Sequence, residues 1–217
     1  MIEARQIGIG GLVLATASLL MFSSSYAEPT TLTHPPEPVA ETQVITFHPA
    51  NPGGDARKGE CWSQSDAIDR PGAWRCVVDN MIYDPCFSDP APGGNPICGA
   101  DPARGQKGFV LQLTKPLPKP RGDYSSDPIP WMVKLADGSI CTLTTGTSAQ
   151  VDGKDLPYEC SDSRECSDDG KCPHLTGITT EFKHDKVWRV EKLAFRSSNG
   201  HVKRLKRETI AIVTVWK

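Results

Sequence analysis

The chain has 217 residues with 24 basic and 26 acidic side chains, which gives a net charge of −2 at pH 7. This balance provides no electrostatic field for nucleic acid or an anionic membrane, so we expect neither as a partner. The length suffices for one domain with a substantial hydrophobic core and a tail.

Residues 1–27 have the pattern of an export signal. Arg5 precedes an apolar run at residues 7–22, and Ser25 and Ala27 are the small residues that a signal peptidase needs around its cut. The apolar run contains glycines and is shorter than the about 20 residues of a spanning helix. The rest of the chain has no apolar run of spanning length. We therefore predict a secreted or periplasmic protein without a membrane span after signal removal.

Residues 28–58 are rich in Pro, Thr and Gly and poor in apolar side chains. The spacing of the prolines favours an extended, solvated chain, so we predict a flexible tether here. Within it only residues 42–47 (TQVITF) have strand character, as a candidate first strand of the fold. We expect residues 59–217 to form a single disulfide-stabilised domain.

All eight cysteines follow the tether and predict a disulfide framework. An even number of cysteines in an exported chain favours four bridges, although eight cysteines allow 105 pairings. No Cys-x-x-Cys pair is present, so we predict no metal site, no redox motif and no cofactor. We favour bridges between sequence neighbours, each closing a loop of roughly 7 to 20 residues: Cys61–Cys76, Cys86–Cys98, Cys141–Cys160 and Cys166–Cys172.

The stretch at residues 61–104 is dense in turn signals such as RPG, DP and DPAPGG. These signals predict irregular backbone with short helical turns, ordered by the bridges more than by a hydrogen-bond ladder. Trp62 directly follows Cys61 and Trp74 stands two residues before Cys76, and the small core's need for apolar area favours burial of both rings. Arg70 and Arg75 are expected to pair with acidic turns.

The remainder of the chain has strand-like patterns, and Asp-Gly between two of the runs is a strong hairpin signal. A change in the phase of the apolar residues at Glu191 and Lys192 suggests a β-bulge. The predicted class is mainly β, a small antiparallel sandwich or barrel with an N-terminal disulfide-stapled irregular lobe. The strand-like segments are residues 108–117, 131–135, 139–144, 186–197 and 209–216.

No catalytic constellation stands out from the sequence. A secreted hydrolase would need two carboxylates flanking a cleft, whereas the acidic residues of the stapled lobe mostly precede proline or lie in polar turns that they stabilise. Asp84 before Pro85 is expected to have that turn role. His174 and His184 have Ser and Asp residues nearby, but no spacing brings them together as a triad. The acidic residues concerned are Asp66, Asp69, Asp79, Asp84, Asp89 and Asp101.

Three surface segments are candidates for ligand contact. The RGD tripeptide, with Arg121 and Asp123, lies in a Pro-rich connection and could contact an integrin. The basic run at residues 201–207, with Lys203 and Arg204, could bind an anionic cell-wall polymer, although a charge-guarded edge strand is the preferred interpretation. The acidic loop at residues 161–172 lacks the ordered calcium-loop pattern, which favours a disulfide-closed surface loop.

The order of these motifs resembles an uncharacterised group of secreted bacterial domains. The shared elements are CW, RPGAWRC, YDPCF, Cys98, GFVLQLTKPLP, W-x-V-x-L-x-DG-x-x-C and Y-x-C, within residues 59–160, and a weaker continuation covers residues 188–216. No established activity comes with the resemblance. It implies that the six cysteines from Cys61 to Cys160 form the framework and that Cys166 and Cys172 form a local pair.

These observations predict an exported binding or interaction module, at the bacterial envelope or outside the cell, rather than an enzyme. Its expected partner is a protein or a cell-wall polymer. The alternatives are a secreted hydrolase that uses Asp or Glu of the stapled lobe, and an inhibitor or host-directed effector. A hydrolase should place two carboxylates in one concave pocket and raise the pKa of one, whereas a binding module should present a flat or edge surface.

Overall fold

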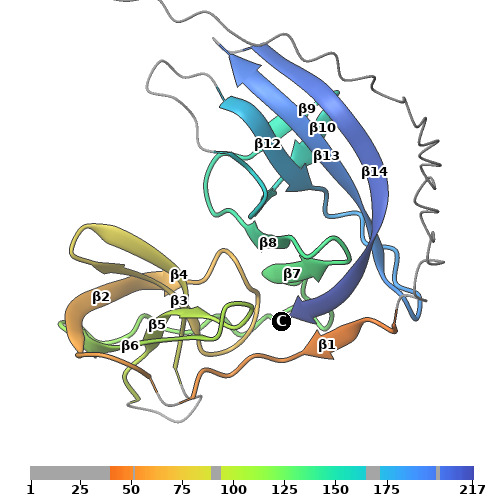
Figure 1. Ribbon diagram of the computed structural model, residues 1–217. Coiled ribbons are helices and arrows are strands. Elements are labelled where there is room, and N and C mark those ends of the chain that lie inside the picture. Colours follow the sequence, from red (N-terminus) through yellow and green to blue (C-terminus); the bar gives the residue numbers. More distant parts are fainter. Residues whose placement is uncertain (1–39, 51, 89–93, 165–171, 199–200) are drawn as a thin grey trace, which may run out of the picture. The chain divides into compact units, whose positions relative to one another are not determined.

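The computed structural model describes residues 40–50, 52–88, 94–164, 172–198 and 201–217, in which every regular element is a strand (Figure 1). The mainly β class is therefore confirmed. No helix in these ranges is long and apolar enough to cross a membrane. The strands are β1 (Gln43–Ile45), β2 (Arg57–Gln64), β3 (Ala73–Val78), β4 (Met81–Phe87), β5 (Ile97–Asp101), β6 (Gln106–Leu113), β7 (Met132–Leu135), β8 (Ile140–Leu143), β9 (Ala149–Val151), β10 (Lys154–Leu156), β11 (Tyr158–Cys160), β12 (Cys172–Ile178), β13 (Arg189–Ser198) and β14 (His201–Trp216).

Strands β2 to β6 close into a barrel, called here the first barrel, through a parallel pairing of β2 with β6. The expectation of irregular backbone with helical turns was wrong for this segment. Its turn signals connect short strands instead: RPG joins β2 to β3, and Asp79 and Asn80 adopt positive φ between β3 and β4. Every second residue of β3 faces the interior: Trp74, Cys76 and Val78 are buried. The few apolar side chains between the turn signals are thus enough to form the inner face of a strand.

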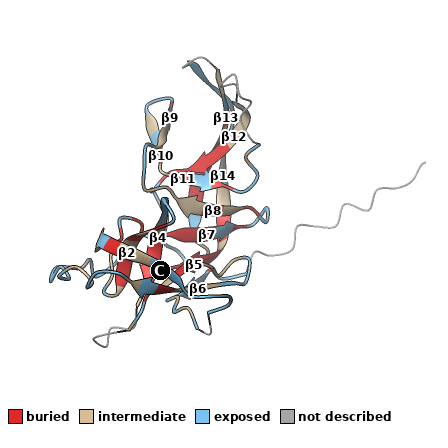
Figure 2. Cartoon of the chain, turned by 90° about the vertical axis from the view of Figure 1, so that its left-hand side faces the viewer, coloured by how far each residue is buried: buried red, intermediate tan, exposed pale blue. Residues whose placement is uncertain are grey.

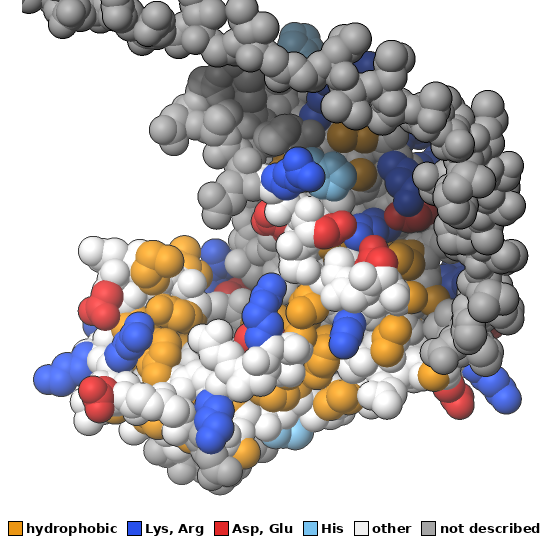
Figure 3. All heavy atoms as spheres, viewed as in Figure 1, with side chains coloured by type: hydrophobic (Ala, Val, Ile, Leu, Met, Phe, Trp, Pro, Cys, Tyr) orange, Lys and Arg blue, Asp and Glu red, His pale blue; other side chains and the backbone are white. Residues whose placement is uncertain are grey.

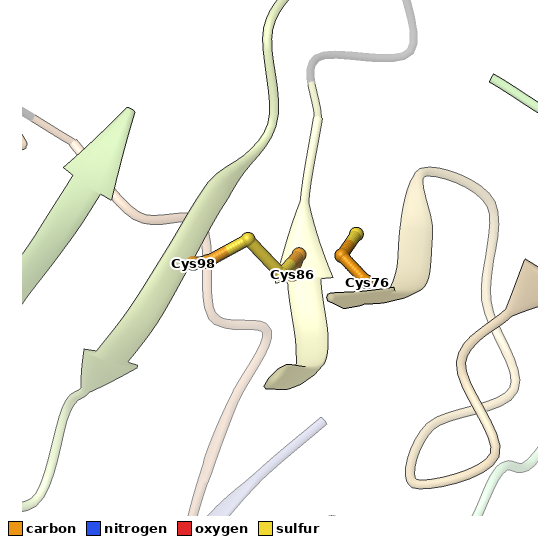
Figure 4. Close-up of side chains that lie close together, drawn as sticks. All are labelled: Cys76, Cys86 and Cys98. Atoms are coloured by element: carbon orange, nitrogen blue, oxygen red, sulfur yellow. A yellow bond between two sulfur atoms is a disulfide. The ribbon is translucent and has the colours of Figure 1, made fainter. Parts of the chain in front are cut away.

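Three of the four expected disulfides are confirmed. They join β2 to β3 (Cys61–Cys76), β4 to β5 (Cys86–Cys98) and β8 to β11 (Cys141–Cys160), with Cα atoms 3.8, 4.3 and 3.9 Å apart. The Sγ atoms of Cys76, Cys86 and Cys98 lie within 4.8 Å of one another in the core of the first barrel (Figure 4). The expected Cys166–Cys172 pair involves Cys166, which lies outside the described residues.

Six further strands, β7, β8, β11, β12, β13 and β14, pair in a closed circuit because β14 pairs with β7 as well as with β13. We call this circuit the second barrel. The hairpin predicted around Asp-Gly is confirmed as β7 and β8. Buried residues line the strands of both barrels (Figure 2). The core of the second barrel contains Val133, Leu135, Cys141, Tyr158, Cys160, Ile178, Val190, Ile212 and Val215.

Strand β1 lies in the segment that was expected to be a tether. It pairs in parallel with β14, from Gln43 opposite Thr214 to Ile45 opposite Trp216. The buried Thr42 hydroxyl donates to the Ile212 carbonyl oxygen at 2.6 Å. The strand expected at residues 42–47 is thus confirmed, and the folded part begins before residue 59.

The change in the phase of the apolar residues at Glu191 and Lys192 does not come from a β-bulge at these residues, so that prediction was wrong. Val190 and Lys192 point to the core of the second barrel, while Leu193 and Phe195 pack under the β9–β10 hairpin on the other face. Because both faces of β13 are covered, apolar residues occur on both faces although the strand is regular at Glu191 and Lys192. The register shift lies between Ala194 and Phe195, where β14 carries the extra residue.

Candidate functional site

The two tryptophans beside the bridging cysteines of the first barrel have different environments. Trp74 is 3% exposed, and its Nε1 donates to the Ser88 hydroxyl at 2.8 Å. Trp62 is 46% exposed, and the Arg75 guanidinium lies 5.9 Å from the centroid of its ring. Trp62 directly follows the inward-facing Cys61 on β2, so the alternation of a strand turns the Trp62 side chain to the outside of the barrel. The predicted burial was correct for Trp74 and wrong for Trp62.

Further apolar side chains lie on the outer face of the barrel near Trp62. Ile82 is 52% exposed and pairs with Val77, which pairs on its other side with Glu60, two residues before Trp62. Met81, 62% exposed, ends the same hairpin but pairs with the buried Val78, so its side chain lies on the opposite face from Ile82, at the rim of the barrel. Figure 3 shows hydrophobic side chains exposed over this part of the molecule. We call Trp62, Val77 and Ile82 the barrel apolar surface.

A buried carboxylate lies beneath the Arg75 side chain. Asp84 has only 2% of its side chain exposed and accepts hydrogen bonds from the Ser65 hydroxyl, from the Asp66 amide at 3.1 Å and from Arg75 at 3.5 Å. Arg75 also pairs with Asp66 at 2.5 Å, so the expected pairing of Arg75 is confirmed. Asp84 lies inside β4 rather than in a turn, although it does bind a backbone amide as expected. Burial raises the pKa of Asp84 despite these hydrogen bonds.

Arg70 differs from the prediction. Its guanidinium donates to the carbonyl oxygens of Lys217, at 2.9 Å, and Phe47, and it covers the ring of Phe87. Burial lowers the pKa of Arg70. Arg70 therefore fastens the C-terminal strand and the β1 segment to the first barrel instead of pairing with an acidic turn.

The described carboxylates of the first barrel do not assemble a hydrolytic site; Asp89 lies outside the described residues. One oxygen of Asp84 is bound by Ser65 and the other by Asp66 and Arg75, so both oxygens already have partners within the protein. The Ser65 hydroxyl oxygen in turn accepts hydrogen bonds from the backbone amides of Ala67 and Ile68. Among the described residues, those that line a cavity of about 680 Å³ beside Phe87 are basic, neutral polar or apolar. The raised pKa of Asp84 is thus a consequence of structural burial.

A second charged cluster lies at the edge of the second-barrel core. The Lys192 side chain is 4% exposed, and its Nζ lies 2.7 Å from oxygens of both Asp137 and Asp162 and 3.0 Å from the Ser139 hydroxyl. Burial alone would lower the pKa of Lys192, but the hydrogen bonds to both carboxylates outweigh it and raise that pKa. The same bonds outweigh burial and lower the pKa values of Asp137 and Asp162. Nothing in the sequence pattern distinguished this lysine from a solvated one.

The environment of Asp84 and that of Asp137 and Asp162 predict pKa shifts in opposite directions. In carbon-13 NMR, Asp84 should titrate above its ordinary pKa of 3.8, and Asp137 and Asp162 below it. Asp137 and Asp162 then contribute stability that is present above the unfolded pKa and is lost as the pH falls through their folded values. Asp84 contributes stability that is present below its unfolded pKa and is lost as the pH rises through its raised value. Coincident titration of all three carboxyls would contradict the described contacts.

The RGD segment is attached to the first barrel through its arginine. The Arg121 amide and Nε donate to the Gln64 side-chain oxygen at 3.0 and 2.7 Å, and its guanidinium reaches Asp69 at 3.4 Å. Asp123 is exposed. Only the carboxylate end of the tripeptide is therefore free of contacts among the described residues.

The other sequence candidates lie apart from this segment. Lys203 and Arg204 are exposed on β14, where Arg204 pairs with Asp152 at 2.7 Å. His184 stacks on Trp188 with ring centroids 3.8 Å apart. Asp162, bound to Lys192, makes no histidine contact within the described ranges, so no triad forms there.

Comparison of the chain with known protein families, with curated proteins and with solved structures found no match. The function is therefore inferred from the residues and their geometry.

Proposed function

We propose that this chain is an exported protein-binding module and that the barrel apolar surface is its contact surface. The observation that carries the proposal is the 46% exposure of Trp62 on a strand that a disulfide ties into a closed barrel. Residues 1–27 support export, and disulfides are typical of oxidising compartments outside the cytosol. The resemblance to secreted bacterial domains supports an envelope or extracellular location.

Several features favour a protein as the partner. Trp, Met and Arg are enriched at protein interfaces, and Trp and Arg are frequent among the residues that dominate binding energy. Trp62 and Arg75 provide two of these residue types on one surface, and the exposed Met81 lies at the nearby rim. Two disulfides hold the strands in place, so little ordering of the backbone opposes association. Binding of a sugar polymer would instead favour tryptophan rings that line a groove.

The alternative functions have less support. A hydrolase needs a carboxylate free to reach a substrate, whereas both oxygens of Asp84 are bound within the protein. An integrin-directed effector needs a free RGD arginine, whereas Arg121 is bound to Gln64 and Asp69.

The test replaces Trp62 and Ile82 and measures partner capture. We expect the immobilised wild-type protein to retain a partner from the envelope and culture fluid of the producing organism, and we expect Trp62→Ala/Ile82→Ser to lose it. With that partner purified, the affinity should fall about 30-fold or more, because a buried interface tryptophan commonly contributes 2 kcal/mol or more.

The control is Ile129→Ser, which removes an apolar side chain of similar exposure, 44%, outside this surface. Both variants should melt like the wild type, because the side chains removed are about half exposed. Equal retention of the partner by Trp62→Ala/Ile82→Ser would refute the proposal.

A further inference from the structure

One long strand edge of the second barrel has no partner strand. Strand β14 pairs with β13 from His201 to Ala211. Its opposite edge pairs with β7 only from Ile212 to Trp216. Within the described residues, the second edge at positions 201–210 therefore presents backbone amides and carbonyls that no other strand uses. Such an edge is a template for the addition of another strand.

The side chains on this part of β14 are basic and exposed. Lys203 stands directly opposite Arg196 of β13, and both are exposed and form no ion pair with any described residue. Like charges directly opposite each other on a sheet are destabilising, and an anionic group between them would relieve the repulsion. Beside them the apolar side chains of Val202 and Leu205 are 44% and 48% exposed.

We propose that the free edge of β14 at residues 201–210 binds an extended acidic segment of a partner protein as an added strand. Backbone hydrogen bonds to the unpaired edge would provide affinity, and alternate side chains of the ligand would provide specificity. Acidic side chains would neutralise Lys203 and Arg196, and apolar ones would cover Val202 and Leu205.

The charge on the edge selects among occupants. Basic side chains on an edge strand repel a second copy of the same strand, which is how such edges avoid self-association. The same side chains attract an acidic strand, so the edge favours a different chain over self-pairing. An anionic polysaccharide would neutralise the charge but would leave the backbone edge unpaired and Val202 and Leu205 uncovered. This edge is separate from the barrel apolar surface, so the inference goes beyond the proposed function.

The test uses a fluorescein-labelled ten-residue peptide of alternating glutamate and valine and the purified protein. Fluorescence anisotropy should show saturable binding that weakens about tenfold in Arg196→Glu/Lys203→Glu, since exposed charge pairs contribute up to about 1 kcal/mol each. Lys119→Glu, which reverses an exposed charge elsewhere, is the control. Hydrogen exchange of amides within residues 201–210 should slow when the peptide binds.

Three outcomes would overturn the inference. The first is the absence of saturable binding. The second is equal binding of a peptide in which proline replaces every valine, because proline lacks the amide that a ladder needs and such binding would reflect charge alone. The third is unchanged affinity in Arg196→Glu/Lys203→Glu. Trp62→Ala should bind the peptide like the wild type, so failure at one surface is distinguishable from failure at the other.

Discussion

Replacing Cys61, Cys76, Cys86 and Cys98 together with alanine should unfold the first barrel and leave the second barrel folded. The reason is that four of the eight buried residues in the first-barrel core are these cysteines. The two bridges span 15 and 12 residues, and each contributes about 3 kcal/mol in the chain-entropy model. Their combined loss, about 6 kcal/mol, is comparable to the whole net stability of a small domain, about 5–15 kcal/mol.

Hydrogen exchange measured by mass spectrometry reports this result strand by strand. Protection of β3 and β4 should disappear, while protection of β13 should persist because the second barrel keeps its own core. The matched control replaces Cys141 and Cys160, which should lower protection in the second barrel and spare the first. Retained protection of β3 in the fourfold variant would show that the bridges do not hold the first barrel together.

Replacing both carboxylates around Lys192 should have the second large effect. In Asp137→Asn/Asp162→Asn the ammonium of Lys192 remains buried without an anion. Breaking a buried ion pair from one side costs about 3–5 kcal/mol. We expect about 2–3 kcal/mol, because Asp137 and Asp162 are themselves 37% and 42% exposed and water screens part of the interaction.

Denaturant titration measures this loss as a shift of the unfolding midpoint. The control, Asp55→Asn/Asp123→Asn, removes the same charge from two exposed carboxylates and should change the free energy of unfolding by less than about 0.5 kcal/mol. Equal shifts in the two double variants would mean that the Lys192 cluster contributes no more than surface charge.

The local signals in the sequence were reliable guides to the fold. Neighbour pairing placed three disulfides correctly, because antiparallel strands close in sequence bring neighbouring cysteines opposite each other, as with Cys61 and Cys76 on β2 and β3 and with Cys141 and Cys160 on β8 and β11. Asp-Gly fixed the β7–β8 hairpin. Of the first-barrel strands, β6 lies within the segment expected as a strand, residues 108–117, whereas β2 to β5 were missed because dense turn signals separate them and favoured an irregular interpretation.

The candidate site could not be read from the sequence for a different reason. Trp62 stands one residue from Cys61 and Trp74 two residues from Cys76, so once both cysteines face the core of a strand pair, Trp62 faces solvent and Trp74 faces the core. This difference was not visible while the segment was expected to be irregular. Lys192 of β13 is bound by side chains from the β7–β8 turn and from the segment that follows β11. Such an environment depends on pairings between distant segments, which local periodicity does not reveal.

The most direct test of the account is photo-crosslinking in the organism that produces the protein, with a photoreactive amino acid introduced at position 82. The account predicts an adduct with one protein partner, which Trp62→Ala abolishes while the chain remains folded. The same probe at position 129, an equally exposed apolar position outside the barrel apolar surface, should give no such adduct. Adducts from both positions, or an adduct from position 82 that persists in Trp62→Ala, would contradict the claim that this surface binds a partner.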